Sequence, residues 1–147
     1  MPQVSKYPVS KDVYEQIFDI LLGALAGLQT RKQVSNFIAD FLTPTEAIMF
    51  SKRLAIGVLL AKKYDYRDIS KILRVSTTTV GSVSLLYNHR PNFKKTVDEI
   101  TRSEEMKKVW FELGEKIADV LSTGGAKSSG WFYLKRELRK KRNKKVL

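Results

Sequence analysis

The apolar residues between positions 66 and 85 constrain the fold of this chain more tightly than any other feature. Ile69 and Leu73 are four residues apart, so they lie on one face of a helix. Val80 and Val83 are three residues apart and have the same property in a second segment. The spacing therefore predicts two short helices that cross through a tight turn.

The residues between these two pairs suit a sharp corner. Val75 would fill the corner, and the small side chain of Ser70 would let the two backbones approach each other. Ser76 stands where the second helix needs an N-cap, because its hydroxyl can accept a hydrogen bond from the first turn. Arg74 occupies a position where glycine is common, since such a turn can require a positive φ. We expect this arginine to destabilise the turn if that angle is present.

The outward face of the second helix would carry only short side chains. These are Thr77, Thr78, Gly81 and Ser82. Such a face can enter the major groove of DNA and contact base edges. We interpret the segment as a DNA-binding helix-turn-helix, and the alternative is an ordinary two-helix corner in an all-helical domain.

Basic residues around the corner would hold the DNA backbone. Arg67 and Lys71, on the first helix, are predicted to contact phosphates and to set the register without reading sequence. Arg74 and Arg90 would add further phosphate contacts. Together with Ser76 and the four outward residues, they make up the predicted DNA-binding site.

The charge of the chain is concentrated in two places. Among 147 residues the net charge is +12, and residues 61–100 hold eight Lys and Arg against four acidic residues. The C-terminal tail, residues 131–147, holds eight against one, namely Lys135, Arg136, Arg139, Lys140, Lys141, Arg142, Lys144 and Lys145. This distribution favours a polyanionic partner, with the tail as a nonspecific nucleic-acid contact. The alternative is a basic surface kept for solubility.

Three aromatic residues, Trp131, Phe132 and Tyr133, precede the basic run. They could stack on unpaired bases, so RNA is a possible partner. The preferred interpretation is that they dock the tail onto the core.

The composition argues against an enzyme. The chain has no cysteine and one histidine, His89, so we expect no metal site and no disulfide. It contains neither a Gly-rich phosphate loop nor a serine-elbow motif, and we expect no catalytic residues and no cofactor. We find no secretory signal and no apolar stretch long enough for a bilayer, which predicts a cytoplasmic, nucleoid-associated protein without membrane contact.

The whole chain is predicted to be all-α. Its clearest helix starts are Thr30–Gln33 and Thr43–Glu46, which have the pattern of capping boxes, and the helix after Thr43 should run to about Lys63. A helix starting at Ser10 precedes them, and helices holding Phe93 and starting at Ser103 follow the corner. The predicted organisation is a dimerisation and helix-turn-helix domain (10–92), a helical extension (93–122), a flexible linker (123–130) and the basic tail helix (131–147).

The first helix carries an apolar band, from Val13 to Leu28, that is too wide for the surface of a small monomer. We therefore expect an intertwined homodimer, in which two reading helices lie about 34–36 Å apart and engage two half-sites. The alternative is burial of this band in a larger monomeric core.

Residues 41–88 resemble the Trp repressor superfamily, and most of all its YerC/YecD-like branch. The resemblance is carried by Thr43-Pro44 with Glu46, by Arg53, by Asp68-Ile69 and by Ser76-Thr-Thr-Thr-Val80. It implies an intertwined all-α dimer that binds operator DNA and regulates transcription.

The resemblance does not carry over the amino-acid ligand. The family's tryptophan carboxylate is held by an arginine on the reading helix, and Ser82 occupies that position here. Arg53 matches a second ligand-side arginine and Thr43 a nearby threonine, but both are interpreted as packing and capping residues. A serine cannot form the charged bidentate clamp, so tryptophan is not expected to act as corepressor. The alternative functions are a replication- or phage-type module, an RNA-binding module and a protein-interaction adaptor.

Overall fold

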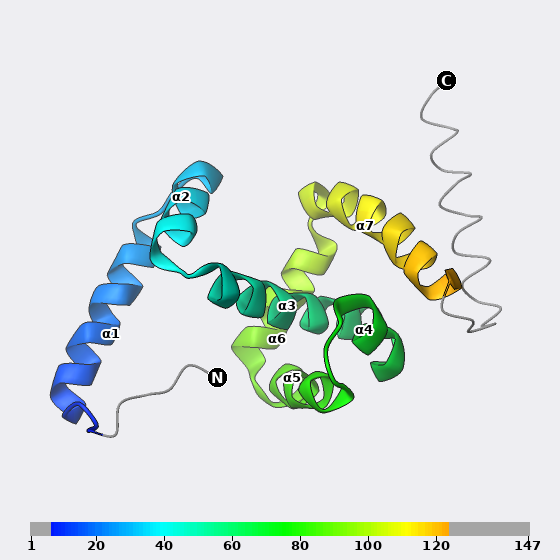
Figure 1. The fold of residues 1–147 in the computed structure, drawn as a ribbon. Helices are drawn as coiled ribbons and strands as arrows, with labels where there is room; N and C mark the ends of the chain where they lie inside the picture. The colour runs from blue at the N-terminus through cyan, green and yellow to red at the C-terminus, as the bar shows by residue number, and fades with distance from the viewer. Residues whose placement is uncertain (1–6, 124–147) are drawn as a thin grey trace. The chain divides into compact units, whose positions relative to one another are not determined.

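The computed structural model describes residues 7–123, which form seven α-helices and contain no strand (Figure 1). The helices are α1 (Lys11–Ala26), α2 (Arg31–Phe41), α3 (Pro44–Ala61), α4 (Tyr66–Leu73), α5 (Thr77–His89), α6 (Pro91–Arg102) and α7 (Glu104–Thr123). The predicted all-α fold class is confirmed. From residue 124 onward, the predicted linker and basic tail lie outside the described residues.

Two helix starts are fixed by side chains three residues apart. The Gln33 N–H donates to Thr30 Oγ1 at 3.2 Å, and the Thr30 N–H donates to Gln33 Oε1 at 3.1 Å. At the start of α3, the Thr43 N–H donates to Glu46 Oε2 at 2.8 Å, and this bond lowers the pKa of the Glu46 carboxyl. Both predicted capping boxes are confirmed, because each satisfies N–H groups that the first helical turn leaves unpaired.

Helix α3 ends at Ala61, two residues before the predicted end. Lys63 adopts a positive φ of 68°, which no helix can continue. The Tyr64 N–H then donates to the Leu59 carbonyl at 3.1 Å, and the Lys63 N–H donates to the Leu60 carbonyl at 2.9 Å. This pair of bonds is a Schellman motif, a helix ending that usually has glycine where Lys63 stands.

The chain divides into two compact units, Met1–Ile48 and Met49–Leu147, with the division inside α3. In the first unit, neither α1 nor α2 contains a buried residue. Ring pairs occur within each helix: Tyr14 stacks on Phe18, and Phe37 stacks on Phe41. Within residues 7–48, the first unit therefore has apolar faces but no buried core.

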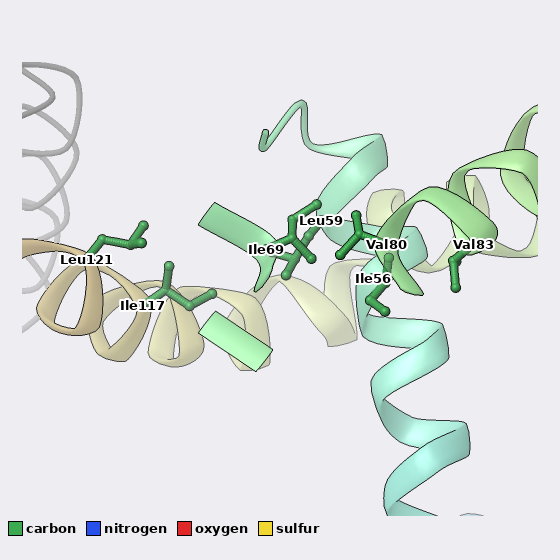
Figure 2. Close-up of a cluster of buried hydrophobic side chains, with 7 residues drawn as sticks. All are labelled: Ile56, Leu59, Ile69, Val80, Val83, Ile117 and Leu121. Atoms are coloured by element: carbon green, nitrogen blue, oxygen red, sulfur yellow. The ribbon is translucent and has the colours of Figure 1, made fainter. Parts of the chain in front are cut away.

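The core of the second unit is formed by four helices, two of which, α4 and α5, are the helix-turn-helix (Figure 2). Its buried members are Ile56 and Leu59 of α3, Ile69 of α4, Val80 and Val83 of α5, and Ile117 and Leu121 of α7. The three corner residues among them were predicted to face inward, and this is confirmed. Leu73 and Val75 also pack against this core.

Helices α3 and α6 approach closely at Gly57. A Cβ atom on this glycine would lie 3.0 Å from Phe93 Cζ and 3.2 Å from Val97 Cγ2. Val97 is fully buried, so it has little room to move aside. A side chain at position 57 would therefore push against Phe93 and Val97 of α6.

Helices α6 and α7 belong to the same compact unit as the helix-turn-helix. Helix α7 packs against both α4 and α6 and places Ile117 and Leu121 in the shared core. The division of the chain at residues 92, 122 and 130 stays a prediction.

Candidate nucleic-acid interface

The corner between α4 and α5 is held by one serine. Arg74 has φ 53° and ψ 55°, the left-handed conformation expected at this position. The Ser70 carbonyl accepts from the Val75 N–H at 3.2 Å, and the Ser70 hydroxyl donates to the Val75 carbonyl at 2.5 Å. Ser70 thus pairs both backbone groups of Val75, a role beyond the small size that the sequence indicated.

Both helices of the corner have side-chain caps. The Thr79 N–H donates to Ser76 Oγ at 3.1 Å, which confirms Ser76 as the N-cap of α5. At α4, the Asp68 N–H donates to Asp65 Oδ1 at 2.8 Å. Asp65 was not singled out in the sequence, although aspartate is a common N-cap.

The four predicted reading residues all lie within the first two turns of α5. Thr77, Thr78 and Ser82 are exposed, and Gly81 is half-buried. Residues three and four apart are neighbours on a helix, so these four form one surface. Ser76, also exposed, lies directly before it. We call Thr77, Thr78, Gly81 and Ser82 the reading face; its contact with DNA stays a prediction.

The predicted phosphate contacts fall into two groups. Arg67 and Lys71 are exposed on α4, and Arg74 is exposed in the turn that joins α4 to the start of α5. Arg90 is also exposed but follows the last residue of α5. A helix of 13 residues is about 20 Å long. Arg90 is therefore separated from the reading face by most of the length of α5.

The hydroxyl groups near the reading face are not equally available. Ser82 Oγ donates to the Thr78 carbonyl at 3.1 Å, and the hydroxyls of Ser76 and Thr79 pair at 2.9 Å. The Ser82 donor and one donor of the Ser76–Thr79 pair are therefore used within α5 and its N-cap. Thr77 and Thr78 are exposed, so their hydroxyl and methyl groups are the candidates for contact with a ligand.

Tyr66 borders the reading face and was missed in the sequence. It is the first residue of α4 and is 42% exposed. A Cβ atom built on Gly81 would lie 3.8 Å from Tyr66 Cε2. Helical periodicity relates residues within one helix, so it gave no signal for a neighbour across the corner.

The far half of α5 is tied to α6 by a charged network. The Tyr87 hydroxyl donates to Asp98 Oδ1 at 2.8 Å, and Lys94 Nζ donates to Asp98 Oδ2 at 3.3 Å. The hydrogen bond from Tyr87, with that from Lys94, lowers the pKa of the Asp98 carboxyl. Bonds to Tyr87 and Asp98 raise the pKa of Lys94. The network fixes the end of α5 that leads to Arg90.

Within residues 7–123, no three His, Asp or Glu side chains gather in a way that would hold a metal ion. None of the helices in that range combines the length and the hydropathy that a membrane crossing needs.

The all-α fold and the capped corner define a helix-turn-helix protein of the class that binds DNA and regulates transcription. Residues 16–101, more than half of the chain, match the family model described as Trp repressor protein. The chain belongs to the Trp repressor family, a family of DNA-binding regulators and not of enzymes. No curated protein and no solved structure matches the chain. The family match runs from α1 into α6, so α7 lies beyond it.

Proposed function

We propose that this protein is a homodimeric transcriptional regulator of the YerC/YecD-like branch that binds a specific double-stranded DNA sequence. The observation that carries the proposal is the exposed reading face on a helix whose opposite side is fully buried. Val80 has no exposed surface, and Val83 is also buried. Burial on one side holds the helix rigidly while its short side chains remain open to a groove.

The basic residues of the corner support the same proposal. Arg67 and Lys71 are exposed on α4 and Arg74 in the turn before α5, and none of them takes part in the ion pairs found within the described residues. Unpaired surface cations are suited to phosphate contacts, which position a protein on DNA. Arg90, at the other end of α5, would reach a phosphate farther along the duplex.

The first unit supports dimerisation. Its helices expose large apolar side chains, among them Ile20 at 73%, Tyr14 at 59% and Ile17 at 54%. A helix pair with no buried residue cannot stabilise itself, and apolar exposure on this scale marks an interface. We propose that a second copy of the chain covers these faces. Analytical ultracentrifugation at micromolar concentration should give twice the mass of one chain; the mass of one chain would contradict the dimer.

Tryptophan is not proposed as a corepressor. Ser82, at the position of the family's carboxylate-binding arginine, is neutral and its hydroxyl already donates within the helix. If the carboxylate of bound tryptophan has no partner in a partly buried site, the free energy of binding is weaker by a few kcal/mol, which is a hundredfold or more in affinity. Calorimetry with millimolar L-tryptophan should show no binding; micromolar binding that also tightens DNA binding would overturn this part of the proposal.

The function is tested by selecting bound sites from a random DNA pool and by gel shifts on double-stranded DNA, single-stranded DNA and RNA. We expect an imperfect palindrome with half-sites about 10 bp apart, bound in preference to the other nucleic acids. Tighter binding to RNA or to single strands would favour the RNA-binding alternative. No binding to any nucleic acid would favour a protein-interaction adaptor.

A further inference from the structure

The reading face lacks every side chain that makes two-point hydrogen bonds with bases. Guanine is commonly recognised by arginine or lysine, and adenine by asparagine or glutamine. From Thr77 to Leu86, α5 contains none of these residues. Its Ser82 hydroxyl is used as a donor inside the helix. The reading face instead presents the methyl groups of Thr77 and Thr78 and the backbone at Gly81.

Gly81 is not required by the packing of this protein. It lies in the middle of α5, where alanine is strongly preferred over glycine. A Cβ atom built there would meet Tyr66 Cε2 alone, at an ordinary van der Waals distance of 3.8 Å. Gly57 is the contrasting case, because a Cβ atom there would crowd Phe93 and Val97 at 3.0 and 3.2 Å. The glycine at position 81 therefore points to an external group that must come close.

The surroundings of Gly81 indicate the nature of that group. The ring of Tyr66 forms one wall, and Thr77 and Thr78 are the helical neighbours at four and three residues. The Tyr66 ring and the methyl groups of the two threonines are apolar. The base-edge group in the major groove that fits this description is the 5-methyl group of thymine.

We propose that Gly81, the Tyr66 ring and the two threonines form a notch that reads thymine through its methyl group. This inference rests on the proposed binding of α5 to the major groove. It assigns Tyr66 as a specificity-determining residue, and it gives Gly81 a role that neither the fold nor helix stability supplies.

The test uses the full-length protein and the DNA site obtained by selection. Each thymine of one half-site is replaced in turn by uracil, which removes the methyl group and leaves the hydrogen-bonding pattern unchanged. At one or two positions, we expect Kd to rise about fourfold, the effect of burying one methyl-sized group. Replacing guanine by 7-deazaguanine, which lacks the N7 acceptor, should leave Kd within about twofold, since no two-point donor faces it.

Protein variants locate the notch. In Gly81→Ala the new methyl group fills the space, so the thymine-to-uracil ratio of affinities should fall from about fourfold toward one. The melting temperature should not fall, because alanine suits the helix. Tyr66→Phe keeps the wall and should keep the ratio, whereas Tyr66→Ser should lose it.

The outcomes separate this inference from the proposed function. A protein that prefers a DNA sequence but tolerates uracil at every position, or selects half-sites without thymine, would overturn the notch alone. A thymine preference that Gly81→Ala leaves unchanged would also overturn it. A protein that prefers no duplex sequence would overturn the proposed function itself.

Discussion

At the scale of single residues, Arg74 shows a conflict between stability and binding. Its left-handed conformation costs a non-glycine residue about 1–2 kcal/mol, and the extra freedom of glycine in the unfolded chain offsets part of that. Arg74→Gly should therefore raise the free energy of unfolding by about 0.5–1 kcal/mol in urea denaturation. It should also weaken DNA binding. The slope of log K against log salt concentration (the salt slope) should become shallower by about 0.9, the value for one lost phosphate contact.

Lys63 provides a matched control, because it has the same backbone conformation at the end of α3. Lys63→Gly should give a similar gain in stability and no change in the salt slope. If the two variants affect binding equally, Arg74 is not a phosphate contact.

Residues also show what could and could not be predicted. The capping boxes at Thr30 and Thr43 and the cap at Ser76 were predicted correctly, because each depends on groups three residues apart. The contact of Tyr66 with the Gly81 region was not predicted, since it arises only when the corner folds. The helical pattern of α7 was visible in the sequence, but its packing against α4 joins residues as distant as Ile69 and Ile117.

At the scale of elements, the two sides of α5 should be separable by mutation. Val80→Asp would place a carboxylate where no surface is exposed, at an expected loss of several kcal/mol. Thermal melting should show an unfolded or badly destabilised protein. Thr78→Ala, on the exposed side, should change stability by less than about 0.5 kcal/mol while it weakens sequence preference. A Val80→Asp variant that melts like the parent would contradict the helix-turn-helix.

The link between α5 and α6 should respond to pH. The pKa of Asp98 is lowered in the folded state, first by the hydrogen bond from Tyr87. The resulting stabilisation is fully present above the usual aspartate pKa of about 3.9 and is lost as the pH falls through the lowered folded value. Asp98→Asn should therefore show a smaller loss of stability below about pH 4 than the parent. Tyr87→Phe should raise the pKa of Asp98 in an NMR titration; an unchanged value would show that this bond is not its main cause.

At the scale of the whole molecule, two C-terminal deletions should have different effects. Removing residues 103–147 takes Ile117 and Leu121 out of the core, and each buried aliphatic side chain contributes about 2–5 kcal/mol. This truncated protein should not fold stably, as circular dichroism would show. Removing residues 131–147 deletes eight basic residues and none of the core residues within the described part of the chain. The fold of residues 7–123 should stay intact, and a lower melting temperature would indicate that Trp131, Phe132 and Tyr133 dock onto the core.

The shorter deletion should weaken binding to all DNA sequences by a similar factor. Each lost phosphate contact makes the negative slope of log K against log salt concentration shallower by about 0.9. The slope should therefore become shallower by a few units. The ranking of preferred sites should stay the same. An unchanged slope would mean that the tail binds another partner, such as an acidic protein.

The complete burial of Ile69 decides how this regulator can be redesigned. The side chains around it come from α3, α5 and α7, so the corner cannot be cut out and transplanted as a separate peptide. Its reading face is different, because Thr77, Thr78 and Ser82 contribute nothing to that core. New target sequences are therefore best sought by exchanging these surface side chains on the intact framework.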